Sequence, residues 1–278
     1  MPARTKQRES FRPGVLGLIL PAVFFMVVVV VIPFVGIFAQ ALKEGWEVFA
    51  KSFTDSNTIY AIGLSSVLTL IALPLTAAFG VVAAWALAKF RFPGRAIILA
   101  VLDLPFTISP IIAGLLFILL YGSYGFFGPL LQSWGIQIIF TPAGVLLTTC
   151  FVVMPFVVKE LLPTMEELGN EDEEAAISLG AGGWRTFWKV TLPNIRWAVL
   201  YGLTLAAARA AGEFGAASVV SGLIRGKTAT LPIQIEILYN EYAISAAFAG
   251  ATLFVVFSLI TLIFKFALEQ RIKRERAK

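Results

Sequence analysis

The sequence predicts an all-α integral membrane protein with six transmembrane helices and both termini on the cytoplasmic side. Hydrophobic residues make up 58% of the 278 residues and charged residues only 14%, whereas soluble domains carry about 25% charged residues. Six apolar segments are each long enough to span the hydrocarbon core, which takes about 20 residues. The basic residues between these segments are unequally distributed, and this inequality indicates the orientation.

The first apolar segment, 15–41, follows a basic tail at 1–14. It resembles a signal peptide in having Ala39-Gln40-Ala41 near its end, but a signal-peptide core has only about 7 to 15 residues. We therefore interpret it as a retained span. Its two prolines, Pro21 and Pro33, are tolerated in a membrane helix.

Five further spans are predicted, and a basic tail at 266–278 follows the last of them. Their ranges are 58–88, 96–121, 141–161, 196–220 and 243–265. Pro74 and Gly80 predict that the second span is tilted or kinked. Pro105 and Pro110 are five residues apart in the third span, so the helix must open there.

The basic residues place the N-terminus inside. Seventeen of the 22 then lie on the cytoplasmic side, namely Arg4, Lys6, Arg8, Arg12, Lys89, Arg91, Arg95, Lys159, Arg185, Lys189, Arg196, Lys265, Arg271, Lys273, Arg274, Arg276 and Lys278. Lys43, Lys51, Arg225 and Lys227 lie outside, and only Arg209 lies within a span. This is a positive-inside distribution.

Composition excludes several classes of function. The chain has no histidine, which excludes a histidine-based catalytic triad, metal site or proton relay. Its one cysteine, Cys150, lies in an apolar run, which excludes an intrachain disulfide and argues against a metal cluster. The net charge of +5 is not gathered in basic blocks with aromatics, so nothing indicates nucleic-acid binding.

Residues 170–193 form a polar island that this orientation places in the cytoplasm. Asn170 is a favourable N-cap, the acids at 171–174 suit the first turn of a helix, and Gly180 provides a stop. A second short segment, 184–191, is expected to end before Pro193. An ordinary solvated loop is the simplest alternative. The acids can also meet basic residues of a partner.

Spacing within the island gives it a second interpretation. Glu174-Ala175-Ala176, then Gly180, then Leu192-Pro193 resembles the loop Glu-Ala-Ala-x3-Gly-x9-Ile-x-Leu-Pro of ABC importer permeases, although Val190 stands in place of the Ile. The resemblance implies the type I importer permease fold. It also implies that the island is a coupling helix, which docks into a cleft on a separate ATPase subunit.

The resemblance extends over most of the chain. Segments 90–95, 102–110, 208–216 and 219–226 are similar to the sulfate/thiosulfate permease family, CysW type. This implies a permease domain at 58–265, a bacterial cytoplasmic (inner) membrane, and import of sulfate, and of thiosulfate, by alternating access. Molybdate or tungstate permeases, which share part of 208–216, are the alternative. Implied partners are two CysA-type ATPases, a CysT-type permease and an extracytoplasmic sulfate-binding protein.

No catalytic residue and no cofactor are expected in this chain. It lacks a Walker A motif, so ATP and Mg belong to the partner ATPase. The segment 222–228 is one residue short of a P-loop and lies outside. An intramembrane enzyme using Asp103 and Glu213 as paired carboxylates, or a membrane scaffold, are the alternatives from other classes.

Two charged residues are candidates for the substrate pathway. Arg209 and Glu213 lie at i and i+4, on one face of the fifth span. A charge there costs about 2.5 to 3.5 kcal/mol on insertion scales, so neither should face lipid. They form either an ion pair that locks the bundle, or a site in which Arg209 compensates an oxyanion and Glu213 orients it.

Two further groups of residues are weaker candidates. One group lies around the break that Pro105 and Pro110 are expected to cause, and it consists of Asp103, Thr107 and Ser109. Backbone N–H groups exposed at such a break can bind an anion. Alternatively, this is a packing kink with Asp103 paired to Lys or Arg. Outside, the region 221–230 begins with the candidate Ser221 and contains Arg225, Lys227, Thr228 and Thr230. These last four residues form either a basic vestibule for an incoming anion, a docking surface for its carrier, or an ordinary exposed loop.

Overall fold

A computed structural model describes residues 13–276, and every regular element in that range is a helix. The predicted tail at 1–14 lies almost entirely outside the described residues. The first span consists of α1 (Pro13–Met26), a π-helical turn η1 (Val27–Val31) and α2 (Ile32–Ala41). In η1 the Ile32 N–H bonds to the carbonyl of Val27, five residues back. This wider turn accommodates the ring of Pro33, which clashes with a regular α-helix.

The second span is a single long helix. After the short α3 (Trp46–Ser52), α4 (Ser56–Lys89) begins at Asp55, whose carboxylate accepts the Thr58 N–H at 2.9 Å. Such a side-chain cap satisfies one of the unpaired donors at a helix start. Pro74 lies inside α4, and the helix continues through it.

The third predicted span is broken, as its prolines predicted, but the break lies only at the second of them, Pro110. It consists of α5 (Arg95–Thr107) and α6 (Pro110–Tyr121), which are bent by 115° to each other. Ile108 and Ser109 have extended backbones, as expected for residues just before a proline. Pro105 remains inside α5, so Pro110 sets the break. The short α7 (Gly128–Ser133) follows.

The polar island lies between two long helices, α8 (Pro142–Leu168) and α11 (Leu192–Ala211). It contains α9 (Glu171–Ser178), α10 (Gly183–Thr186) and a second π-helical turn, η2 (Phe187–Thr191). The prediction that Pro193 ends the second segment is wrong, because the helix runs on into α11. In η2 the Leu192 N–H bonds to the Phe187 carbonyl, five residues back, which makes room for the proline ring.

The chain ends with α12 (Gly215–Ser221), α13 (Leu231–Asn240) and α14 (Ile244–Arg276). Within the described residues, four helices are long and apolar enough to cross a membrane, at 19–41, 56–89, 142–168 and 244–271, or five if α5 and α6 count as one. The segment predicted as the fifth span is divided between α11 and α12. Arg196 and Arg209 lower its hydropathy. The chain is a multi-pass membrane protein, but six spans are not confirmed.

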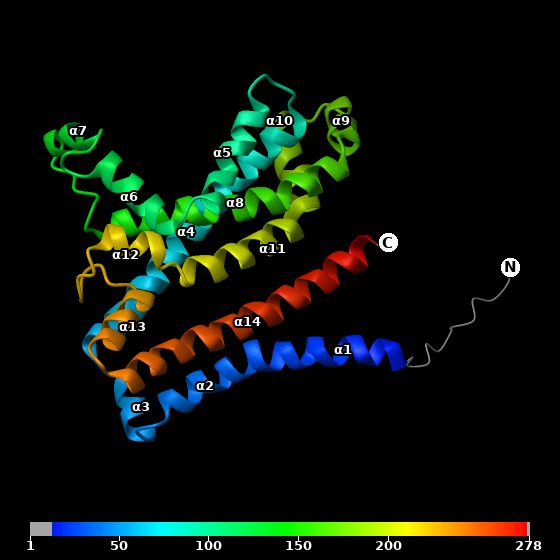
Figure 1. Ribbon diagram of the computed structural model, residues 1–278. Coiled ribbons are helices and arrows are strands. Elements are labelled where there is room, and N and C mark those ends of the chain that lie inside the picture. The colour runs from blue at the N-terminus through cyan, green and yellow to red at the C-terminus, as the bar shows by residue number, and fades with distance from the viewer. Residues whose placement is uncertain (1–12, 277–278) are drawn as a thin grey trace.

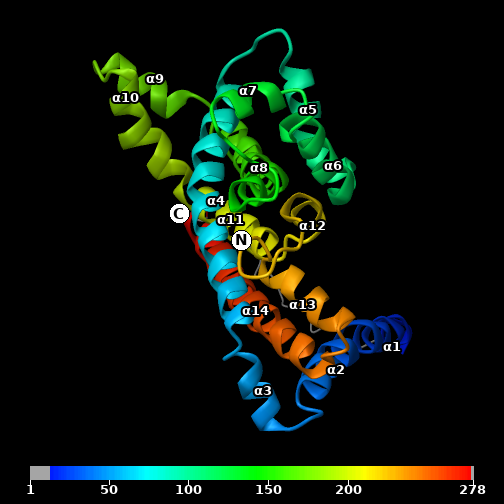
Figure 2. The ribbon, with the colours of Figure 1, turned by 90° about the vertical axis from the view of Figure 1, so that its left-hand side faces the viewer.

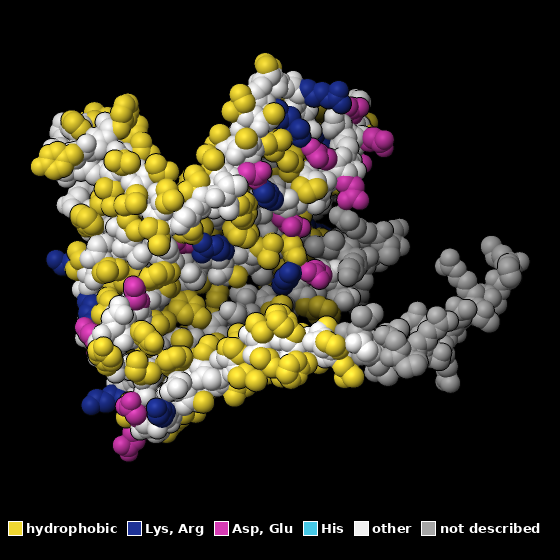
Figure 3. Space-filling model, in the orientation of Figure 1, with side chains coloured by type: hydrophobic (Ala, Val, Ile, Leu, Met, Phe, Trp, Pro, Cys, Tyr) yellow, Lys and Arg dark blue, Asp and Glu magenta, His cyan; other side chains and the backbone are white. Residues whose placement is uncertain are grey.

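The views in Figures 1 and 2 show how the elements are arranged. The helix α1–α2 lies beside α14, whereas α9 and α10 lie at the end of the molecule opposite α12 and α13. In Figure 3, charged side chains gather over α9 and α10 and over the opposite corner near α3, and hydrophobic side chains cover much of the surface between. This distribution is expected for a membrane protein whose middle faces lipid and whose two ends face water.

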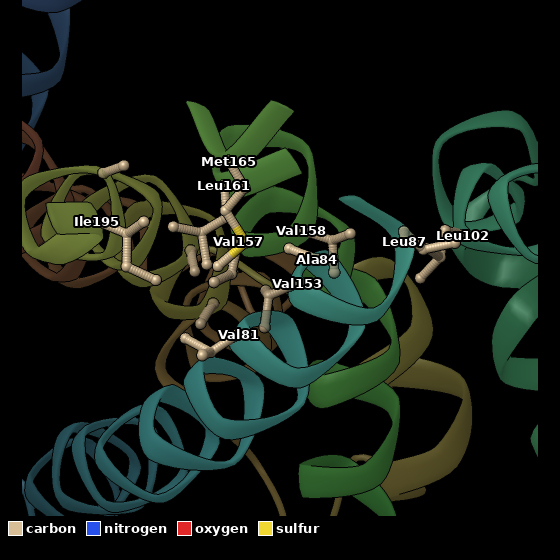
Figure 4. Packing of buried hydrophobic residues seen from close by; sticks show 13 residues of the cluster. Val81, Ala84, Leu87, Leu102, Val153, Val157, Val158, Leu161, Met165 and Ile195 are labelled. Atoms are coloured by element: carbon tan, nitrogen blue, oxygen red, sulfur yellow. The ribbon is translucent and has the colours of Figure 1, made fainter. Parts of the chain in front are cut away.

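The core is centred on α8, which packs between α4 and α11. Figure 4 shows its labelled side chains, among them Val157, between those of α4 and Ile195 of α11. Glycines permit this close approach: a Cβ at Gly80 of α4 would lie 2.5 Å from Cγ1 of Val157, and one at Gly202 of α11 would lie 3.2 Å from its Cα.

Replacing Gly80 with Leu should therefore destabilise the helix bundle. Forcing extra volume into a packed core costs about 1–3 kcal/mol, so we expect a lower midpoint of thermal unfolding for the purified chain in detergent. Gly63 is the matched control, because it lies in the same helix and has no atom within 4 Å of a Cβ. Equal midpoints for Gly80→Leu and Gly63→Leu would contradict this account of the α4–α8 contact.

Candidate functional site

The island presents its candidate coupling residues outward. α9 begins after Asn170, as predicted, although the Asn170 side chain makes no capping hydrogen bond. Glu174 and Ala175 are exposed, Ala176 is partly buried, and no residue of α9 is buried. An exposed helix with small residues on its outer face can enter a cleft on another protein.

Gly180 closes α9 in a conformation that favours glycine. Its φ is +85°, in the left-handed region that other residues enter at a cost of about 1–2 kcal/mol. The Gly180 N–H bonds to the Ile177 carbonyl at 2.9 Å, and the Ala181 N–H bonds to the Ala176 carbonyl at 3.0 Å. A Cβ at Gly180 would meet nothing within 4 Å. Its requirement for glycine therefore comes from the backbone.

Hydrophobic side chains in α9 and in the segment that follows it are exposed. Leu179 is 90% exposed, and Ile177, Trp184 and Trp188 are also exposed. The Trp184 ring contacts Trp188 edge-on, with centroids 5.6 Å apart. Grouped apolar side chains outside a protein core mark an interaction surface. The other two motif residues lie at the start of α11, with Leu192 partly buried and Pro193 exposed.

Two acids of the island bind this chain. Glu173 forms an ion pair with Lys89 at 3.1 Å and accepts a hydrogen bond from the Thr191 hydroxyl at 2.6 Å. Asp172 accepts one from the side-chain amide of Asn194 at 3.0 Å. From the sequence, all four acids at 171–174 were expected to be available to basic residues of a partner. Lys89 was used only to determine the orientation in the membrane. No sequence pattern links Lys89 to Glu173, because chain folding alone brings them together.

Arg209 and Glu213 form an ion pair with each other, which was the first of the two alternatives predicted for them. The Arg209 Nη1 lies 2.6 Å from the Glu213 Oε2, and the side chains are 32% and 1% exposed. The Glu213 Oε1 also accepts the Ala216 N–H at 2.9 Å, so the carboxylate joins the end of α11 to the start of α12. Arg209 is one-third exposed, but it does not line the nearby groove of about 640 Å³ between α11, α13 and α14, which Ala208 and Gly212 line.

The breaks in two predicted spans meet in space. A Cβ at Gly215, the first residue of α12, would lie 2.6 Å from the Cβ of Pro110, the first residue of α6. One at Gly114 of α6 would lie 2.9 Å from the Ala216 carbonyl oxygen. Two helix starts, one of them capped by Glu213, therefore lie against each other. The sequence nominated the two breaks separately, without indicating that they touch.

The residues around the α5–α6 break have local partners. Asp103 forms an ion pair with the Nζ of Lys159 at 2.5 Å, which is the packing alternative stated for it. The Thr107 hydroxyl donates to the Leu104 carbonyl at 3.1 Å within α5. Ser109 is exposed at the start of α6, and its side chain makes no capping bond.

The outer candidates differ from each other in accessibility. Ser221 is fully buried, and its hydroxyl donates to the Ser218 carbonyl at 3.2 Å and accepts the Leu223 N–H at 3.1 Å. These bonds hold the loop together. Arg225 lies nearer the surface and pairs with Glu241 at 2.6 Å. Of these two residues, only Arg225 offers a charge to an approaching anion.

The chain resembles known membrane transport proteins along nearly its whole length. Residues 76–274 match the family model described as "Binding-protein-dependent transport system inner membrane component". The chain is 50% identical to the sulfate transport system permease protein CysW of Synechocystis over 260 residues, or 94% of each chain. Identity to the Escherichia coli K12 CysW protein is 46%, covering 89% of this chain and 85% of that one.

Similarity also extends to a second type of permease and to solved structures. The sulfate transport system permease protein CysT of Escherichia coli K12 is 32% identical, covering 91% of this chain and 94% of that one. The crystal structure of a bacterial alginate ABC transporter, in complex with an alginate-bound periplasmic protein, has a TM-score of 0.73. It covers 93% of this chain and 94% of that chain at 19% identity, a likeness of fold alone.

Proposed function

Because the chain belongs to the family of binding-protein-dependent transport system inner membrane components, we propose that it is the permease subunit of an ATP-driven ABC importer that carries sulfate. The observation that carries this proposal is its 50% identity to a sulfate permease over 94% of both chains. Its relatives are named as transport permeases. Accordingly, this chain provides part of the passage, and a separate subunit hydrolyses ATP.

In this proposal the chain crosses a bacterial cytoplasmic membrane six times, with both termini inside. α5 with α6 forms the third span, and α11 with α12 forms the fifth. The positive-inside count supports this orientation, and so does the position of α9 and α10 at the end of the molecule opposite α12 and α13. The helix α9 is then in the cytoplasm, where an ATPase can reach it.

The exposed side of the island docks into an ATPase. Glu174 and Ala175 face outward on α9, and the exposed Ile177, Leu179 and Trp184 extend the same surface. ATP and Mg bind to the partner, and closure of two CysA-type subunits displaces α9. The spans then open toward a loaded sulfate-binding protein, and hydrolysis returns them to the inward-facing state.

The cargo needs a polar passage, because moving an ion such as sulfate into bare hydrocarbon costs tens of kcal/mol. One copy of this chain offers few intramembrane polar groups, so a homologous CysT-type permease supplies the second half. Arg209 is the cation that compensates the anion in this proposal, since the charge count leaves it as the one basic residue within a predicted span and its side chain is one-third exposed. Ser109 precedes the first turn of α6, where the two breaks meet, and the backbone N–H groups of that turn can bind the anion.

Uptake of labelled sulfate tests the proposed function. The complex with its ATPase, CysT-type permease and binding protein is reconstituted in vesicles. Sulfate uptake is then measured alone and with a roughly tenfold excess of either molybdate or thiosulfate. We expect ATP-dependent uptake that thiosulfate reduces and molybdate does not. Uptake that is abolished by molybdate, or that is seen only with labelled molybdate, would assign the chain to another oxyanion.

A further inference from the structure

The attachment of α9 to the membrane helices is polar. None of its residues is buried, so apolar burial contributes little to holding it in place. Its two ends are glycines with positive φ, Gly169 at +65° and Gly180 at +85°, and glycine is the residue that restrains a backbone least. Side-chain contacts must therefore fix the position of α9.

Lys89 provides the central contact. It is the last residue of α4, and its side chain is only 10% exposed. Its Nζ donates to the Gly169 carbonyl at the end of α8 and lies 3.1 Å from the Oε2 of Glu173 in α9. The other oxygen of Glu173 accepts the hydroxyl of the buried Thr191, at 2.6 Å, just before α11. One lysine and one glutamate thus join four helical elements.

The environment makes this contact stronger than an ordinary surface ion pair. Glu173 is 17% exposed and Lys89 10%, so water and salt screen the pair less than they screen an exposed one. Both of its hydrogen bonds involve a charged group, and such bonds are about twice as strong as neutral ones. The cavity left between α9 and its neighbours is only about 20 Å³, room for about one water.

We propose that Lys89, Gly169, Glu173 and Thr191 form a latch that makes α9 move as one body with the cytoplasmic ends of α4, α8 and α11. Lys89 is then a positioning residue for energy coupling: a displacement of α9 by the ATPase reaches α4 through its side chain. The inference rests on the proposed function. It adds a contact that decides whether movement of the island reaches the spans, and the two charged residues of this contact, Lys89 and Glu173, lie outside the Glu174–Pro193 motif.

Lys89→Gln tests the latch, with Arg91→Gln as its matched control. Arg91 is exposed and lies two residues later, and no described residue forms a hydrogen bond or ion pair with it. In the reconstituted complex we expect Lys89→Gln to lower the sulfate transported per ATP hydrolysed by about fivefold or more, the lower range of coupling between sites. Arg91→Gln should leave the ratio unchanged. An unchanged ratio in Lys89→Gln would overturn the latch.

A second measurement keeps the test decisive if Lys89→Gln fails to assemble. Millisecond amide hydrogen exchange of residues 171–178 in the purified full chain should be about tenfold faster in Lys89→Gln. It should stay close to wild type in Lys89→Arg, which keeps the charge. Equal exchange in wild type and Lys89→Gln would overturn the latch. A wild-type complex that transports no sulfate would overturn the proposed function instead, and the exchange comparison would still stand.

Discussion

Replacing Arg209 with Gln is expected to destabilise the chain by about 3 kcal/mol and to abolish sulfate uptake. Removing one partner of a buried ion pair costs about 3–5 kcal/mol, because the remaining charge is left uncompensated. The lower figure applies because Glu213 is 1% exposed whereas Arg209 is 32% exposed. The midpoint of thermal unfolding in detergent measures the first effect, and labelled sulfate uptake by the reconstituted complex measures the second.

The double variant Arg209→Gln/Glu213→Gln separates the two roles of Arg209. It removes both charges, and the amide oxygen of Gln can still accept the Ala216 N–H that Glu213 now accepts. We expect its thermal midpoint to return close to wild type, while sulfate uptake stays low because the cation that compensates the anion is missing. If uptake returned together with stability, Arg209 would serve only to hold the bundle together.

Replacing Gly180 with Leu is expected to reduce sulfate-dependent ATP turnover about tenfold. A side chain at φ +85° costs about 1–2 kcal/mol, and about 1.4 kcal/mol corresponds to a factor of ten. The backbone relieves this strain by changing the path that joins α9 to α10. The outward face of α9 is then misdirected. ATP hydrolysis by the complex with loaded binding protein measures the effect.

Gly182→Leu is the control for Gly180→Leu. Gly182 lies in the same connection, has no atom within 4 Å of a Cβ, and has an ordinary φ of −70°. We expect its ATP turnover to stay within roughly twofold of wild type, since no left-handed strain arises. A similar loss of ATP turnover in both variants would show that the added side chain itself, and not the left-handed backbone of Gly180, causes the loss.

Local features of the sequence predicted much of the fold. The apolar run at 15–41 corresponds to the helix from Pro13 to Ala41, and the proline at 110 marks a break that the structure contains. The apolar span and the proline break are both determined by residues that are adjacent in the sequence. The left-handed Gly180 was likewise indicated by its position after a short helix, because a helix end commonly needs that conformation.

Features that depend on distant contacts were not predictable in this way. Pro193 was expected to end a helix, but the π-helical turn before it absorbs the proline ring. Glu173 was assigned to a partner, yet Lys89 and Thr191 bind it within the chain. Ser221 looked like part of an exposed loop and is buried. In each case the deciding group is placed by tertiary packing or by backbone geometry that residue types alone do not specify.

ATP hydrolysis and sulfate accumulation, measured together in the same vesicles, test the central claim most directly. ATP is enclosed with the ATPase face of the reconstituted complex, and sulfate-loaded binding protein is added outside. We predict that loaded binding protein raises ATP turnover several-fold, and that labelled sulfate accumulates inside in proportion to the ATP consumed. Sulfate entry at the same rate without ATP, or ATP turnover without accumulation, would contradict an ATP-driven sulfate permease coupled through α9.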